Sequence, residues 1–150
     1  MSKLTHIDAK GEARMVDVSG KPVQQRTAVA RGEIRMAKET LKLIRGDKIA
    51  KGNVLATARI AGIQAAKRTG DLIPMCHPLS ISHCEVEFEI PKSGDRIVII
   101  STARITAQTG VEMEALTAVN LAALTIYDMC KAVDKKMRIT NTRLVSKTKK

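Results

Sequence analysis

The stretch GVEMEALTAVNLAALTIYDMCK, residues 110–131, decides how this chain folds. Its apolar residues recur around nearly the whole circumference of a helix, which predicts a long helix that is buried or lies in an interface. Steps of about 100° per residue from Asp128 gather most of the polar residues into one stripe, interrupted by Leu121 and Leu124. The other members of this polar stripe are Glu114, Thr117, Asn120, Thr125 and Lys131.

The polar stripe has two interpretations. Asp128 and Lys131 are three residues apart and therefore neighbours on a helix, so the stripe can be a salt-bridged surface facing solvent. Its other members are mostly short Thr and Asn side chains, which are more typical of the wall of a cleft. Glu112 points almost the opposite way.

The segments before this helix predict one strand, two helices and a stiff loop. The strand is expected from alternation, the helices from apolar residues at helical spacing with a closing glycine, and the loop from its two prolines. In order, these are loose residues 1–12, a strand at Arg14–Ser19, a connector at 23–32, a helix at Glu33–Arg45 ended by Gly46, a helix at about Asn53–Thr69 closed by Gly70, and the loop Asp71–Pro78.

Around the long helix the sequence predicts three further strands. Ser80–Ile90 alternates apolar residues with glutamates, Arg96–Ala107 is more apolar and is expected to be central, and Met137–Val145 alternates weakly. The sequence predicts a flexible basic tail at Lys147–Lys150. The order of elements predicts an α+β fold in which helices cover one side of an antiparallel sheet.

Length and composition narrow the class of protein. The 150 residues suit one domain with a sizeable core. No uncharged run of eighteen apolar residues is present, which argues against a membrane span, and the first residues lack the apolar core of a signal peptide. A cytoplasmic protein is therefore expected. Three cysteines without close pairing spacing favour reduced thiols.

The net charge of +11 predicts an anionic partner, such as nucleic acid, an anionic membrane or a phosphorylated small molecule. Phe88 and Tyr127 are the only aromatic residues, so the chain lacks a platform on which single-stranded bases could stack. A basic scaffold for double-stranded nucleic acid or RNA remains the alternative function, and it predicts strongly salt-dependent binding without turnover.

The sequence Met75-Cys76-His77-Pro78 is the first candidate for chemistry. A metal site is weakly supported because adjacent residues seldom bind one ion and no CxxC pair is present. His77 lies between prolines in a rigid loop, so it can present its imidazole to a ligand or donate to a backbone carbonyl, and both remain open. Cys84 and Cys130 are expected to be small buried hydrophobic residues.

Lys51 is a second candidate, because it comes just before a predicted helix start where free amides favour an anion. The alternative is a solvated surface lysine. Neither a P-loop nor a GxGxxG sequence is present.

Two long motifs, DLIPMCHPL and TGVEMEALTAVNLAALTIYDMCKAVDK, closely resemble those of the molybdenum cofactor biosynthesis protein C (MoaC) family, as does MVDVSGK near residue 15. The resemblance covers almost the whole chain. It implies a ferredoxin-like α+β fold, hexamers built as trimers of dimers, and sites at subunit interfaces. It also implies a cyclic pyranopterin monophosphate synthase activity, which converts a cyclised dihydroguanosine triphosphate to cyclic pyranopterin monophosphate and releases diphosphate.

The resemblance also assigns residues. It implies no resident cofactor or metal, although a divalent cation can accompany the phosphates. Asp128 and Lys131 match the catalytic pair, and Lys51 a catalytic lysine. The residues matched to substrate binding are Met75, Cys76, His77, Met113, Glu114 with Glu112 beside it, the phosphate-binding Arg26, and Lys147.

The residues of this chain suit the implied chemistry in two respects, and the sequence departs from the family in one. A triphosphate needs cations, and proton transfers can be supplied by an Asp–Lys pair and a histidine, the more so if desolvation and nearby cations lower a lysine pKa. Family members often end in a stretch such as KTGGKSG, whereas this chain ends in KTKK. Lys147 is kept, but the glycines are missing.

Overall fold

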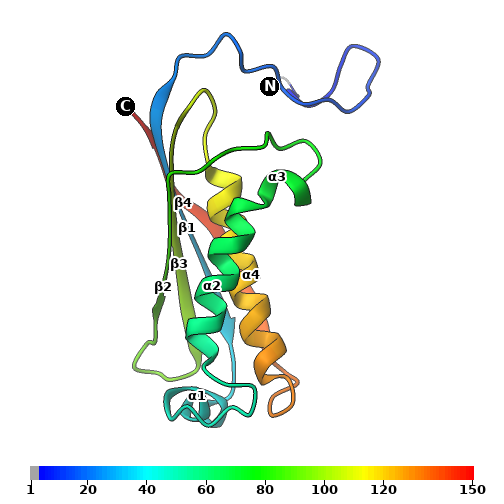
Figure 1. Cartoon of the computed structure of the whole chain (residues 1–150). Helices are drawn as coiled ribbons and strands as arrows, with labels where there is room; N and C mark the ends of the chain where they lie inside the picture. The colour runs from blue at the N-terminus through cyan, green and yellow to red at the C-terminus, as the bar shows by residue number, and fades with distance from the viewer. Residues whose placement is uncertain (1–3) are drawn as a thin grey trace.

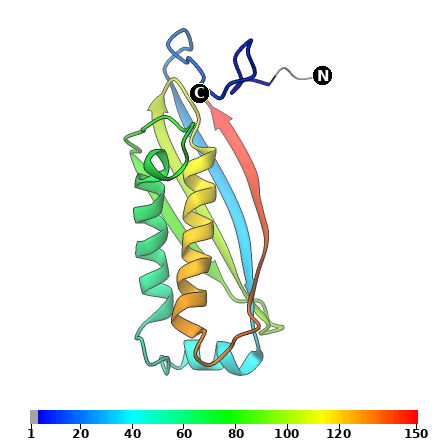
Figure 2. The ribbon, with the colours of Figure 1, turned by 90° about the vertical axis from the view of Figure 1, so that its right-hand side faces the viewer.

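The structure, a computed structural model, describes residues 4–150 and shows a four-stranded sheet with two long helices on one face (Figures 1 and 2). The two long helices lie side by side (Figure 2), and the two short ones lie near opposite ends of them (Figure 1). The elements are β1 (Gln24–Arg35), α1 (Lys38–Arg45), α2 (Val54–Lys67), α3 (Thr69–Leu72), β2 (His83–Glu89), β3 (Arg96–Ala107), α4 (Glu112–Cys130) and β4 (Arg138–Lys149).

The sheet has the strand order β2-β3-β1-β4, and every neighbouring pair is antiparallel. Helices connect β1 to β2 and β3 to β4, which gives the ferredoxin-like arrangement implied by the resemblance. The expected strands β2 and β3 are confirmed, with β3 central and Val86 of β2 buried against the helices.

The other central strand, β1, was not expected, and the prediction of a connector at 23–32 is wrong. The face of β1 that packs on the helices carries Ala28, Ala30 and Gly32, so small residues fill positions where large apolar ones would signal a strand. The strand β1 also includes residues 33–35, which were predicted to begin the helix at Glu33–Arg45. The helix α1 starts only at Lys38. The helix α1 does end before Gly46, as predicted.

The predicted strand at Arg14–Ser19 is also wrong, because those residues belong to no named strand. Residues 14–19 form a mostly exposed segment, and within the described part of the chain the only pairing nearby is an isolated bridge between Ile7 and Ala13. Alternation over six residues is too short a signal when no neighbouring strand is available to pair with it.

Glycines let the two layers approach closely. A Cβ at Gly62 of α2 would lie 2.9 Å from the carbonyl oxygen of Ala118 in α4, and a Cβ at Gly32 would lie 2.6 Å from the side chain of Val119. The long helices therefore pack on each other and on β1 through small residues. The second helix was predicted as one piece from about Asn53 to Thr69, whereas Arg68 separates α2 from the short α3.

The end of the chain extends the sheet. Lys147, Thr148 and Lys149 belong to β4 and pair with Ala28, Thr27 and Arg26 of β1, so β4 runs beyond the predicted Met137–Val145. The expectation of a separate tail at 147–150 is corrected in this respect, while its flexibility stays a prediction. Residues 1–3 of the loose segment lie outside the described residues.

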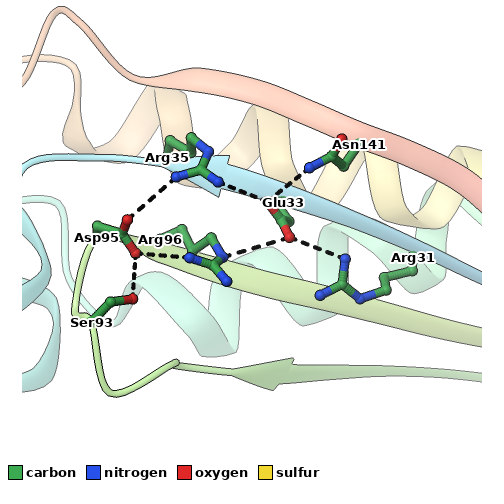
Figure 3. A network of polar contacts seen from close by, with 7 residues as sticks. All are labelled: Arg31, Glu33, Arg35, Ser93, Asp95, Arg96 and Asn141. Atoms are coloured by element: carbon green, nitrogen blue, oxygen red, sulfur yellow. Dashed lines mark hydrogen bonds and ion pairs between the residues drawn. The ribbon is translucent and has the colours of Figure 1, made fainter.

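The face of the sheet opposite the helices carries a polar network around Glu33 (Figure 3). Its carboxylate is almost fully buried and lies 3.1 Å from Arg31, 3.5 Å from Arg96 and 3.8 Å from Arg35. The amide of Asn141, which adopts a positive φ of 55° near an irregularity of β4, donates to the same carboxylate at 3.2 Å. These contacts join β1, β3 and β4 across the sheet.

Candidate functional site

A cavity of about 280 Å³ lies where the N-terminal segment, the loop after α3 and the start of α4 meet. It unites the two long motifs: the loop contributes Met75, Cys76 and His77, and the helix contributes Glu112, Met113 and Glu114. All six of these residues were predicted as substrate-binding residues. The N-terminal segment closes the cavity with Val16, Val18 and Lys21.

The pKa values of the two glutamates in this cavity are shifted in opposite directions. Glu114 is 3% exposed, and burial, together with the nearby Glu112 charge, raises its pKa above the ordinary value. Burial opposes ionisation of Glu112 too, but its own backbone amide and a 3.0 Å ion pair with Lys147 hold its pKa below the ordinary value. A buried acid with a raised pKa beside an ionised one is a combination suited to proton transfer.

The loop residues present a thiol and an oriented imidazole. Burial and the charges of Glu114 and Glu112 raise the pKa of Cys76, which keeps it protonated and makes it a poor nucleophile. His77 lies 2.6 Å through Nε2 from the carbonyl oxygen of Val16. Because a carbonyl only accepts, Nε2 carries the hydrogen, and Nδ1 is left for another partner. His77 therefore donates to a backbone carbonyl and also lines the cavity, while its presentation to a ligand stays a prediction.

A second hollow of about 260 Å³ adjoins the first, and Lys21 and Gly110 line both. Its walls carry four cations, which are Lys21, Arg26, Lys147 and Lys149. Arg26 is 7% exposed, and its guanidinium donates to the carbonyl oxygens of Ala107 at 3.1 Å and Gln108 at 3.3 Å. Carbonyls fix this cation in place without neutralising it, which suits a site for an anion.

The third cluster lies at the other end of α4. Asp128 accepts from Lys131 at 2.8 Å and from Lys51 at 3.2 Å, and Lys51 also donates to the backbone carbonyl of Asp128. All three side chains are about half exposed. The hydrogen bonds and charges of Lys131 and Lys51 lower the pKa of Asp128, and Asp128 in turn raises the pKa of Lys131. The lowered lysine pKa that would favour proton transfer is therefore not found for Lys131 in this chain alone.

The predicted site residues thus fall into two groups. Glu112 and Asp128 both lie on α4, near its opposite ends. The sixteen steps between them, at about 1.5 Å per residue, correspond to a separation of about 24 Å along the helix axis. The first group holds the cavity and the cationic hollow, and the second holds Asp128, Lys131 and Lys51. One copy of the chain cannot bring both groups to one small molecule.

The polar stripe of α4 changes character along the helix. Glu114 and Thr117 are buried, whereas Asn120 and Asp128 are exposed. The cleft interpretation holds at the start of α4 and the salt-bridged surface interpretation at its end. Two apolar residues of α4, Met113 and Leu124, are also exposed.

Three residues of the site were not found from the sequence. Lys21 lies in the MVDVSGK segment, but the resemblance assigned it no role in the site. Gln108 donates to the carbonyl oxygens of Ser19 and Lys21, and this holds the N-terminal segment over the cavity. Lys149 reaches the hollow because β4 pairs with β1, so its place could be predicted only if Gln24–Arg35 had been recognised as a strand.

Two features are absent from the described residues 4–150. No group of three or more His, Cys, Asp or Glu side chains is placed to hold a metal ion. No helix in that range is long and apolar enough to cross a membrane.

The fold and the site define a class: a ferredoxin-like α+β protein whose acid-lined cavity opens beside a cationic hollow, as suits an enzyme for a phosphorylated small molecule. The comparisons with known proteins narrow this class. The chain belongs to the MoaC family, whose profile matches residues 15–150.

Curated relatives resemble the chain over nearly its whole length. A protein from Chloroflexus aurantiacus is 59% identical over 97% of this chain and 90% of its own length. A protein from Parvibaculum lavamentivorans is 56% identical over 97% of this chain and 91% of its own length. One from Pelotomaculum thermopropionicum is 57% identical over 99% of this chain and 87% of its own length. Each is named cyclic pyranopterin monophosphate synthase.

Proposed function

We propose that this protein is a cyclic pyranopterin monophosphate synthase of molybdenum cofactor biosynthesis. It converts a cyclised dihydroguanosine triphosphate to cyclic pyranopterin monophosphate and releases diphosphate, which makes it a lyase. The observation that carries the proposal is the adjacency of the acid-lined cavity and the cationic hollow, in a chain 56–59% identical to proteins of that name.

The adjacency suggests how the substrate lies. In this proposal the purine-derived ring system occupies the 280 Å³ cavity, and the phosphates extend past Gly110 into the cationic hollow. Glu114, with its raised pKa, is suited to donate a proton, and His77 can accept one at Nδ1. Arg26 and Lys147 bind the phosphates.

The separation of the two groups on α4 leads to the second part of the proposal. Asp128, Lys131 and Lys51 act on substrate held in the cavity of another copy of the chain, so that each site is shared between two subunits. Ile60 of α2 is 58% exposed and Leu124 of α4 is 52% exposed. Exposed apolar residues of this kind support association. We propose a homohexamer, a trimer of dimers, with the sites at subunit interfaces.

A shared site would also change the ionisation of Lys131. Its ammonium is exposed in one chain, whereas an interface would desolvate it and bring it near the cationic hollow of the partner. Both effects lower a lysine pKa and would make Lys131 a better proton donor. The reaction needs no resident cofactor in this proposal, a divalent cation would arrive with the phosphates, and the protein works in the cytoplasm.

The test is to incubate the purified protein with the cyclised triphosphate and to measure diphosphate and the pterin product together. Stoichiometric formation of both is expected, and it should not change when duplex DNA is added. If neither product forms while the protein binds duplex nucleic acid with a steep salt dependence, the nucleic-acid scaffold replaces the enzyme.

A further inference from the structure

The cationic hollow contains a pairing that is unfavourable without a ligand. Arg26 of β1 and Lys149 of β4 are directly opposite each other on antiparallel strands, and both line the hollow. Like charges in such positions repel and destabilise a sheet. Within residues 4–150 neither side chain has an ion-pair partner, because the nine ion pairs of that range involve other cations.

Lys147, two residues earlier on the same strand, behaves differently. Its ammonium forms a 3.0 Å ion pair with Glu112, so it is already compensated by an acid of the neighbouring cavity. The hollow therefore has four cations, from Lys21, Arg26, Lys147 and Lys149, and one carboxylate in contact with them, which leaves three positive charges. A ligand that balances this excess must carry several negative charges within a small volume.

We infer that Arg26 and Lys149 form a diphosphate subsite, and that Lys149 positions the diphosphate portion of the substrate and retains free diphosphate after release. This inference rests on the proposed function and adds Lys149 to its binding residues. Carbonyls of Ala107 and Gln108 hold the guanidinium of Arg26 in advance, so the rigid cation needs little reorganisation on binding. Lys149 supplies the opposite wall, and the anion relieves the repulsion across the strands.

The test is calorimetric titration of the full-length protein with inorganic diphosphate. Lys149→Ala should weaken binding about tenfold, which corresponds to the loss of one charge-assisted contact. Lys150→Ala is the matched control, because it removes the same charge from the next residue, which does not line the hollow. Its affinity should equal that of the unchanged protein. Equal weakening in both variants would show that only the net charge of the protein matters, which would overturn the subsite. Unchanged affinity in Lys149→Ala would also overturn it.

Thermal unfolding gives a second readout that a merely structural lysine would not produce. Without ligand, Lys149→Ala should melt no lower than the unchanged protein, because the repulsion with Arg26 is removed. With saturating diphosphate, the rise in melting temperature should be smaller in Lys149→Ala than in Lys150→Ala. A lower melting temperature without ligand and an undiminished diphosphate-induced rise would show that Lys149 only supports the strand.

One further comparison tests the assignment to diphosphate, and two outcomes separate this inference from the proposed function. Inorganic phosphate should bind more weakly than diphosphate, and equal binding of the two would overturn the assignment to diphosphate. If the protein binds diphosphate through Lys149 but does not turn over the cyclised triphosphate, the subsite stands and the proposed function fails. Normal turnover with unchanged diphosphate binding in Lys149→Ala would overturn the subsite alone.

Discussion

Glu33 and Asp128 each gather several cations, but the two carboxylates lie in opposite surroundings. The Glu33 side chain is 5% exposed and is covered by three arginines and an asparagine (Figure 3), whereas the Asp128 side chain is 56% exposed between two lysines. A covered carboxylate cannot recover its hydration if a partner is lost, so its contacts stabilise the sheet. An exposed one exchanges its partners for water at little cost, which leaves it available for chemistry.

Both carboxylates have lowered pKa values, so ionisation alone does not distinguish the two roles. Burial works against the charge of Glu33, and hydrogen bonds from Asn141 and Arg31 more than offset it. The lowering at Asp128 comes from Lys131 and Lys51 without appreciable burial. The comparison predicts that substitutions at Glu33 affect stability and that substitutions at Asp128 affect turnover.

The largest effect is expected at the exposed cluster. Asp128→Asn keeps the size and Lys131→Met keeps the length of the side chain, and each should lower turnover by about 10²–10⁴-fold, as for acid–base groups. The double variant should lose much less than the product of the two single losses, since residues that act as a unit are not additive. Diphosphate release measures the rates, and a near-normal rate in either folded variant would show that the pair is only a solvated salt bridge.

The covered network should give the next largest effect. Glu33→Gln leaves three arginines without their shared carboxylate and should lower the free energy of unfolding by about 2 kcal/mol, less than a deeply buried ion pair because the arginines keep some hydration. Urea unfolding measures it. Glu87→Gln on the exposed side of β2 is the control and should have little effect. Equal stability of the two variants would remove the contrast between Glu33 and Asp128.

Glu114 should show a smaller, pH-dependent effect of opposite sign. Its folded-state pKa lies above the ordinary 4.5, so the folded protein holds this proton more tightly than the unfolded chain. Stability is therefore lost as pH rises from 4.5 through the raised pKa. Glu114→Gln should be more stable than the unchanged protein by about 1 kcal/mol above this window, the order of cost of a poorly compensated buried group. Unfolding curves should converge as pH falls to 4.5, and a difference that persists there would contradict the assignment.

The smallest effect is expected for Asp128→Asn on stability. Since Asp128 and its lysines are exposed, the unfolding midpoint should hardly move, and added salt should reduce the small difference from the unchanged protein by screening the pair. A loss of stability comparable to that of Glu33→Gln would show that Asp128, like Glu33, mainly stabilises the fold.

The sequence predicted the parts of the fold in which apolar residues are large. The alternation of Val86 and Phe88, the apolar β3 and the nearly all-apolar α4 gave these elements with small errors at their ends. The sequence did not predict β1, because Ala28, Ala30 and Gly32 carry no signal unless the closeness of α4 is known.

The candidate site was predicted as a set of residues but not as an arrangement. The motifs named the cavity residues and the Asp128 pair, and helical periodicity placed Glu114 and Asp128 in one polar stripe. Periodicity gives direction around a helix axis but not distance along it. The wide separation of Glu112 from Asp128 along α4 therefore divides the site residues into two groups in a way that is visible only when the packing of the two ends of the helix is known.

In the proposed function, one subunit supplies Lys131 and Asp128 to the cavity of another. The direct test mixes two folded but inactive variants, Lys131→Met and Glu114→Gln, by unfolding and refolding them together, and measures diphosphate release. Shared sites predict recovery to about one quarter of normal turnover, because random pairing leaves about one site in four with both residues intact. Activity no greater than the sum of the separately refolded variants would contradict the account, because it would show that each site is built within one subunit.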